Sequence, residues 1–256
     1  MGEHNLLVID WDYFFPQPRD GGDIDTDLLG LYDWQHAEVP FMIEMVWDTR
    51  AASFLQFGKE LPRCQGYKGF WDRFTITPGA PLAYADSNSY AGLLRPGGDR
   101  GWDSVWLFDA HHDCGGYGHD TLGMWRTRQT FSCEDWMVVH GDLGSKLHVR
   151  YPEWKIHGLT IEPEPLVPVD RQMDDGKPVD VEFGTVFLCR SGAWVPPWCD
   201  DQFTELIETY PGPRVNIDER YPQMHRPFRR ETAENIAALT HEFRRTAESS
   251  DTADTP

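Results

Sequence analysis

Two apolar runs that end directly in acidic residues constrain the fold of this chain more than any other feature. Residues 6–9 (LLVI) lead straight into Asp10, and residues 105–108 (VWLF) lead straight into Asp109. Short, nearly continuous apolar runs are typical of strands in a parallel sheet that is covered on both faces. Because open parallel sheets bind ligands beyond the carboxyl ends of their strands, the pattern predicts acidic side chains gathered at one edge of a sheet.

The rest of the chain alternates between apolar runs and helical patterns. Further strands are expected at 156–161 and 185–189, and helices at 39–56, 202–209 and 230–247. Asp200 and Asp201 are expected to cap the helix that begins at residue 202. This alternation predicts a three-layer α/β/α fold around a mainly parallel sheet, with a single domain over residues 1–248 and a disordered tail over 249–256.

Composition and charge narrow the classes of function. The formal net charge of −19 disfavours nucleic acid as a partner, because phosphate binding needs a basic face. The same charge is compatible with a cationic substrate. No apolar run approaches the roughly 20 residues of a membrane span, and the apolar stretch near the N-terminus is too short for a secretory signal. We therefore expect a cytoplasmic protein without a membrane partner.

The five cysteines argue against two further kinds of structure. They are odd in number, widely spaced and contain no CxxC pair. Such spacing favours neither a disulfide framework nor a structural zinc site. The cysteines are expected to act as small buried apolar residues.

The acidic motif at the end of each apolar run has the composition of a metal site. Asp10 and Asp12 lie two apart on an extended chain, so both can face one point. The alternative is a pair of loop carboxylates, one of which caps a backbone group. Asp109, His111 and Asp113 add two carboxylates and an imidazole, a donor set that suits Mn²⁺, Fe²⁺, Zn²⁺ or Ni²⁺. So much negative charge at the end of a buried strand needs a cation to offset it.

These motifs resemble those of a known family. The run Asp109-Ala110-His111-His112-Asp113 matches the D-A-H-x-D signature of the arginase/agmatinase (ureohydrolase) superfamily. The run from Asp10 to Pro16 resembles the second metal motif of that family, D-x-D-x-x-D-P, with Phe15 in place of the last aspartate. The two motifs stand in the reverse order, so the chain is similar to a circularly permuted branch that includes the peptide arginases.

The resemblance implies two Mn²⁺ ions per chain, with one weaker site as an alternative. The implied ligands are Asp10, Asp12, Asp109, His111, Asp113 and Asn88. Asn88 stands where the family motif G-G-D-H-S carries a histidine, and an amide oxygen is a weaker ligand than an imidazole. His36 is a candidate to complete that position.

The resemblance also implies an activity, the hydrolysis of a guanidino group to urea. The expected substrate is arginine, peptide-borne rather than free, which would become ornithine. Asp113 is expected to pass a proton to the departing amine, with His111 as its neighbour in the catalytic site. His140 is expected to shuttle protons. Two alternatives stay open: hydrolysis of another C–N bond, in a small guanidino compound or an amide, and a non-catalytic binding protein.

A carboxylate outside the metal shell is expected to orient the guanidinium, since a planar cation is best held by a bidentate partner. The candidates are Glu38, Asp218 and Glu219, with Glu134, Asp135 and Glu162 as further alternatives. His112 and His119 are expected to support the ligands, and the aromatic and proline residues of 190–198 to form a wall for a large substrate. Whether the chain forms a homo-oligomer stays open.

Overall fold

The computed structural model describes residues 4–16, 40–97, 100–155, 162–218, 226 and 228–251. Within these residues, seven strands form a sheet in which all neighbouring strands are parallel. In spatial order they are β6 (Asp170–Met173), β5 (Lys146–Tyr151), β4 (Ser104–Phe108), β1 (Asn5–Asp10), β8 (Thr185–Cys189), β3 (Leu82–Ala85) and β9 (Arg214–Asn216). The two strands that carry the acidic motifs, β1 and β4, are therefore neighbours.

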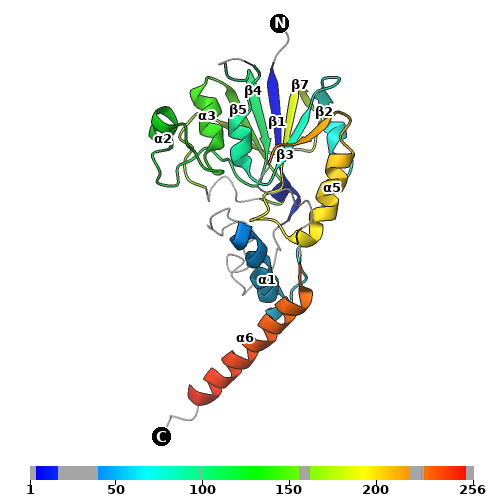
Figure 1. Cartoon of the computed structure of the whole chain (residues 1–256), viewed down its shortest axis with the longest axis vertical. Helices are drawn as coiled ribbons and strands as arrows, with labels where there is room; N and C mark the ends of the chain where they lie inside the picture. Colours follow the sequence, from blue (N-terminus) through cyan, green and yellow to red (C-terminus); the bar gives the residue numbers. More distant parts are fainter. Residues whose placement is uncertain are drawn as a thin grey trace.

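Helices cover both faces of this sheet, as Figure 1 shows. Leu7 and Ile9 of β1 belong to the apolar cluster on the side of α5 (Asp200–Glu208). Val8 belongs to the cluster on the side of α3 (Trp136–Asp142). Alternate residues of a strand point to opposite faces, so a run without polar residues is what two buried faces require. The predicted three-layer α/β/α fold is confirmed.

The remaining elements extend this framework. In Figure 1, α1 (Pro40–Gln56) and α6 (Arg230–Asp251) lie beyond the edge at which the strands end. They pack against each other through small residues, namely Ala51, Ala52, Ala233 and Ala237. The helix α2 (Thr121–Arg128) lies beside α3, and β2 (Phe74–Ile76) pairs with β7 (Val179–Phe183) in a small second sheet.

Most of the predicted elements are present. The strands expected at 6–9, 105–108 and 185–189 are β1, β4 and β8, and the helices expected at 39–56 and 230–247 are α1 and α6. α6 continues past the predicted domain boundary at 248, to Asp251. The strand expected at 156–161 lies outside the described residues.

The predicted cap of α5 is wrong. The helix begins at Asp200, and Cys199 occupies the cap position without a side-chain hydrogen bond to the helix. The Asp200 carboxylate instead accepts hydrogen bonds from the Arg226 guanidinium, at 2.7 and 3.0 Å. A buried cation is costly without a partner, and this ion pair takes precedence over capping.

Two predicted absences can be compared with the structure. None of the five cysteines forms a disulfide. Across the described part of the chain, no helix combines the length and the apolar character needed to cross a membrane.

Candidate metal centre

The two acidic motifs meet because their strands are parallel neighbours in register. Ile9 of β1 lies opposite Phe108 of β4, so Asp10 and Asp109 follow at the same edge of the sheet. The chain then turns into the short 3-10 helix η1 (Trp11–Phe14), and the backbone N–H of Asp12 donates to the Asp10 carboxylate at 2.9 Å. Asp10 therefore caps a backbone group, as the alternative interpretation expected, and also joins the cluster described below.

One half of the cluster is built around the His111 imidazole. Its Nδ1 lies 3.1 Å from Asp12 Oδ2 and 3.4 Å from Asp109 Oδ1. One ligand atom from each of these three residues lies within 4.8 Å of the others. The two carboxylates are buried, whereas the His111 side chain keeps 21% of its surface exposed. The open side of the cluster is therefore the His111 side.

The other half is built around the Asn88 amide, which begins the 3-10 helix η3 (Asn88–Leu93). Its Nδ2 donates to Asp10 at 2.7 Å, to Asp113 at 3.0 Å and to Asp109 at 3.3 Å. Its Oδ1 is buried and accepts no hydrogen bond within the described residues. Asp109 faces both halves, since Oδ1 lies near His111 and Oδ2 lies near Asn88.

The structure thus brings all six predicted ligands together. Asp113 reaches the cluster through a backbone with a φ of 48°, in the left-handed region that is uncommon for residues with a side chain. Gly115 and Gly116, with φ of 70° and 97°, complete the tight turn that follows Asp113. The indole N–H of Trp136, the first residue of α3, donates to Asp113 Oδ2 at 2.6 Å and holds this carboxylate in place.

Burial gives the carboxylates unusual acidities. Burial, together with repulsion from Asp12, raises the pKa of both Asp10 and Asp109 well above the usual range. Burial and the charge of Asp109 likewise raise the pKa of Asp113. For Asp12, burial acts in the same direction, but the hydrogen bond and charge of His111, the Ala110 backbone N–H and the charge of Lys155 together outweigh it, and the pKa is lowered. Like charges held close in a buried site disfavour ionisation.

These features fit a divalent cation. Four buried carboxylates and an imidazole converge from two strand ends, and the donor types are those that bind Mn²⁺, Fe²⁺, Zn²⁺ or Ni²⁺. The carboxylates repel one another, and the oxygen of the Asn88 amide, whose nitrogen lies among them, has no donor within the described residues. A cation among the carboxylates would relieve their repulsion, and it would give the amide oxygen a partner if the amide turned that oxygen inward.

Sequence reasoning missed Ser191, whose hydroxyl donates to Asp10 Oδ2, the same oxygen that Asn88 contacts. Ser191 also has a positive φ, 51°. The sequence places Ser191 just past a predicted strand, but only the structure shows that this strand pairs with β1, with Cys189 opposite Asp10. Polar residues just past the end of a neighbouring parallel strand are expected at the same edge.

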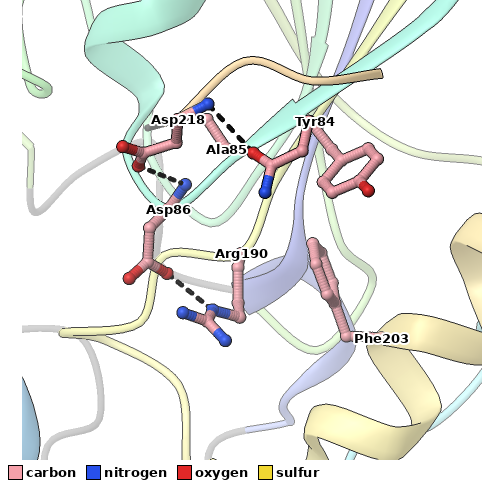
Figure 2. A pocket seen from close by; sticks show the side chains of 7 residues that line it. Tyr84, Ala85, Asp86, Arg190, Phe203 and Asp218 are labelled. Carbon is pink, nitrogen blue, oxygen red and sulfur yellow. Dashed lines mark hydrogen bonds and ion pairs between the residues drawn. The ribbon is translucent and has the colours of Figure 1, made fainter. Parts of the chain in front are cut away.

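A buried ion pair connects the segments that carry Asn88 and Ser191 (Figure 2). Asp86 accepts from Arg190 Nε at 2.7 Å and from the backbone N–H of Gly192 at 3.1 Å. A Cβ on Gly192 would lie 2.6 Å from the Asp86 carboxylate, so this approach requires glycine. The loop after β3 and the turn after β8 are therefore fixed to each other beneath the cluster.

Asp218 belongs to this support and not to the cluster itself. Its Oδ2 accepts from the backbone N–H of Asp86 at 3.2 Å, and its Oδ1 accepts from the Tyr90 hydroxyl at 2.9 Å. Both oxygens thus hold the loop that carries Asn88, and Figure 2 shows the contact with Asp86. The expectation that Asp218 orients a guanidinium receives no support from this placement.

The other candidate carboxylates differ in their surroundings. Glu162 is buried beside the second motif, where it accepts from the His112 backbone at 2.9 Å and from the Tyr151 hydroxyl at 2.5 Å. Asp135 is buried and accepts from Ser132 at 2.8 Å. Glu134 keeps 34% of its side chain exposed, facing His119 at 3.9 Å. Outside the described residues lie the remaining candidates, His36, Glu38 and Glu219.

Lys155 is a second residue that sequence reasoning missed. Its ammonium group donates to the backbone carbonyl of Ala110, inside the second motif, and lies 3.9 Å from Glu162. Its positive charge also helps to lower the pKa of Asp12. Lys155 follows a loop after β5, and no sequence pattern distinguished it from a surface lysine.

His140 does not join the cluster. Its ring is fully buried on α3, Nε2 lies 3.0 Å from the Ala91 carbonyl oxygen, and the ring packs edge-on against Trp136. It therefore stands behind the indole that contacts Asp113, and its placement gives no support to a proton shuttle. Burial lowers its pKa to about 4.

This burial predicts a loss of stability in acid. A neutral His140 stabilises the fold above the unfolded-state pKa of 6.5, and the contribution is lost as the pH falls to the folded-state value of about 4. Between pH 7 and 4, the wild type should lose roughly 3 kcal/mol more free energy of unfolding than His140→Gln. Urea denaturation at both pH values measures this difference. The exposed control His119→Gln should behave as the wild type, and an equal loss in all three proteins would contradict the assignment.

Other predicted neighbours of the site lie where they were expected. His112 is fully buried, and its Nε2 lies 2.9 Å from the Pro163 carbonyl oxygen. Its Nδ1 accepts from the Cys114 backbone at 2.9 Å, which stabilises the turn of the second motif. Trp194, from the predicted aromatic wall, has its ring centroid 6.2 Å from that of His111, at the open side of the cluster.

A large groove begins next to the first motif. It has a volume of about 1050 Å³, and its lining includes Tyr13, Phe14, Phe70, Arg73, Glu153 and Trp154. Tyr13 and Phe14 directly follow Asp12, and the Trp154 indole donates to the Tyr13 carbonyl oxygen at 3.0 Å. The groove is thus lined by residues that directly follow the first motif, whereas none of the six cluster residues is part of its lining.

Comparisons with protein-family models, with curated proteins and with solved structures return no match to this chain.

Proposed function

We propose that this chain is a cation-dependent hydrolase that converts arginine, carried in a peptide, to ornithine and urea. The observation that carries the proposal is the convergence of Asp10, Asp12, Asp109, Asp113 and His111 at the ends of two neighbouring parallel strands. Divalent cations bound there, with Mn²⁺ as the expected ion, would lower the pKa of a water molecule and so supply a nucleophile at neutral pH.

The residues of the cluster would have different roles in this reaction. Asp12, Asp109 and His111 would hold one cation, and Asp10, Asp113 and Asn88 the other, with Asp109 between them. Asp113 Oδ2 accepts from Trp136, which leaves Oδ1 as the atom from which a proton passes to the departing amine. The guanidinium needs a carboxylate partner, and Glu134 is the described candidate that stays partly exposed.

The size of the adjoining groove favours a substrate larger than free arginine. About 1050 Å³ of open space exceeds what one amino acid fills. Aromatic side chains line the groove beside polar ones, which suits a polypeptide segment. Trp154 is linked to the loop of the first motif through Tyr13, so a bound peptide could place one arginine side chain toward the cluster.

The position of Asn88 favours a second candidate function. An amide nitrogen that donates to three carboxylates can stabilise them in place of a cation. A non-catalytic binding protein with this fold would need such a replacement for the cation. Hydrolysis of another C–N bond is the third candidate, because the same donor set would activate water toward an amide.

The nature of the product separates these candidates. The purified chain, loaded with Mn²⁺, is incubated with an arginine-containing peptide, with free arginine and with the matching glutamine peptide. Urea from the arginine peptide, together with ornithine by mass spectrometry, is the expected result. Ammonia from the glutamine peptide without urea would indicate amide hydrolysis. If none of the three substrates gives a product, the non-catalytic binding protein would be the remaining candidate.

A further inference from the structure

The two halves of the cluster differ in the kind of atom that they offer to a cation. The His111 half combines an imidazole nitrogen with carboxylates of Asp12 and Asp109. The Asn88 half contains carboxylates of Asp10 and Asp113, and an amide that has oxygen and nitrogen ends. No imidazole from the described residues hydrogen-bonds to Asn88, Asp10 or Asp113. The chemistry of the second half therefore depends on which end of the amide points inward.

The Asn88 amide can present either its nitrogen or its oxygen to the carboxylates. It is only 4% exposed, its Nδ2 lies between three carboxylate oxygens, and its Oδ1 lacks a donor within the described residues. A half turn of the amide exchanges oxygen and nitrogen with little change in shape. With nitrogen inward, the amide satisfies the carboxylates when no cation is present. With oxygen inward, it would repel them unless a cation lay between.

Ser191 fixes the carboxylate on which this half depends. Its hydroxyl donates to Asp10 Oδ2, and the following residue, Gly192, is held by Asp86 at 3.1 Å. The Arg226 guanidinium also donates to the Gly192 carbonyl oxygen. The turn at 190–192 is thus anchored from both sides, and Asp10 has little freedom to move toward a different donor geometry.

We propose that, among the described residues, Asp10, Asp113 and Asn88 form a cation position with oxygen ligands alone, which binds Zn²⁺ and Ni²⁺ less tightly than the position at Asp12, Asp109 and His111 does. Oxygen ligands suit Mg²⁺ and Mn²⁺, whereas Zn²⁺ and Ni²⁺ prefer a site with imidazole. The inference rests on the proposed function in one respect, since both take the cluster to be a cation site. It adds that the two positions are chemically unequal.

Calorimetric titration of the chelator-treated chain tests the proposal. The wild type should bind about one Zn²⁺ per chain tightly and a second at least about 10-fold more weakly, at the position with oxygen ligands alone. Asn88→His adds an imidazole there and should bind about two Zn²⁺ with similar affinity. Its matched control, Asn88→Gln, keeps an amide in place of the imidazole and should keep the two Zn²⁺ steps unequal. Ser191→Ala should weaken the second step about 10- to 100-fold and leave the first step unchanged.

Two results would overturn the proposal. One is the binding of two Zn²⁺ with equal affinity by the wild type, and the other is two Zn²⁺ steps that stay as unequal as in the wild type in a folded Asn88→His protein. Circular dichroism establishes folding, and Ser191→Ala serves as the test if the histidine variant does not fold. Equal Zn²⁺ sites in a chain that still releases urea would refute only the inequality of the positions. A chain that binds no cation at all would refute the proposed function as well.

Discussion

Asp109→Asn is expected to lower the rate of urea release by at least about a thousandfold, while the protein stays folded. Asp109 lies between both halves of the cluster, with Oδ1 near His111 and Oδ2 near Asn88, so one substitution removes a charged ligand from both cation positions. Asparagine has nearly the same shape, and the buried carboxylate that it replaces has a pKa raised by burial. Loss of this charge should not unfold the metal-free chain.

The control for this prediction flanks the same strand. Asp103 immediately precedes β4, is exposed, and accepts a hydrogen bond from the His4 backbone at 2.6 Å. Asp103→Asn makes the same chemical change at the opposite end of β4 and should keep full activity. Urea assays on both variants, with circular dichroism as the check on folding, measure the effect. An Asp109→Asn protein that retains wild-type turnover would remove the cluster from the mechanism.

Asp200→Ala is expected to lower the free energy of unfolding by about 3–5 kcal/mol. The Asp200 carboxylate accepts from the Arg226 backbone at 2.8 Å and from its guanidinium at 2.7 and 3.0 Å. It also lies 3.6 Å from Arg190. Both arginines are buried, so removing the carboxylate leaves two cations with less compensation in the interior.

The next residue supplies the matched control. Asp201 follows on the same helix and is exposed to solvent. Asp201→Ala should change the free energy of unfolding by less than about 1 kcal/mol, as is usual for surface positions. Urea or guanidinium denaturation of both variants gives the two values. Equal effects at the two positions would show that burial of the ion pair does not govern stability here.

The fold could be predicted because its signal is local. A strand buried on both faces must be apolar at every position, and β1, β4 and β8 are found where such runs occur. The placement of Asp10 and Asp109 at one edge of the sheet could be predicted for a related reason. Each follows a strand directly, and parallel strands end at the same edge. The structure adds that β1 and β4 are immediate neighbours.

The contacts that could not be predicted depend on tertiary packing. Ser191 reaches Asp10 only because β8 is the other neighbour of β1, an order that the sequence does not state. Asp200 looked like a helix cap, but its partner Arg226 lies 26 residues away in the chain. His140 was expected near the substrate, yet packing turns it toward Ala91 and Trp136. In each case a side chain from a distant segment determined the role.

The cation content of the chain tests the central claim most directly. The purified protein is stripped with a chelator, titrated with Mn²⁺ in a calorimeter and compared with Asp109→Ala. The proposed function predicts about two Mn²⁺ per chain for the wild type, with the Asn88 position the weaker, and loss of binding in the variant. No Mn²⁺ binding by a folded wild-type chain, or equal binding by Asp109→Ala, would contradict it.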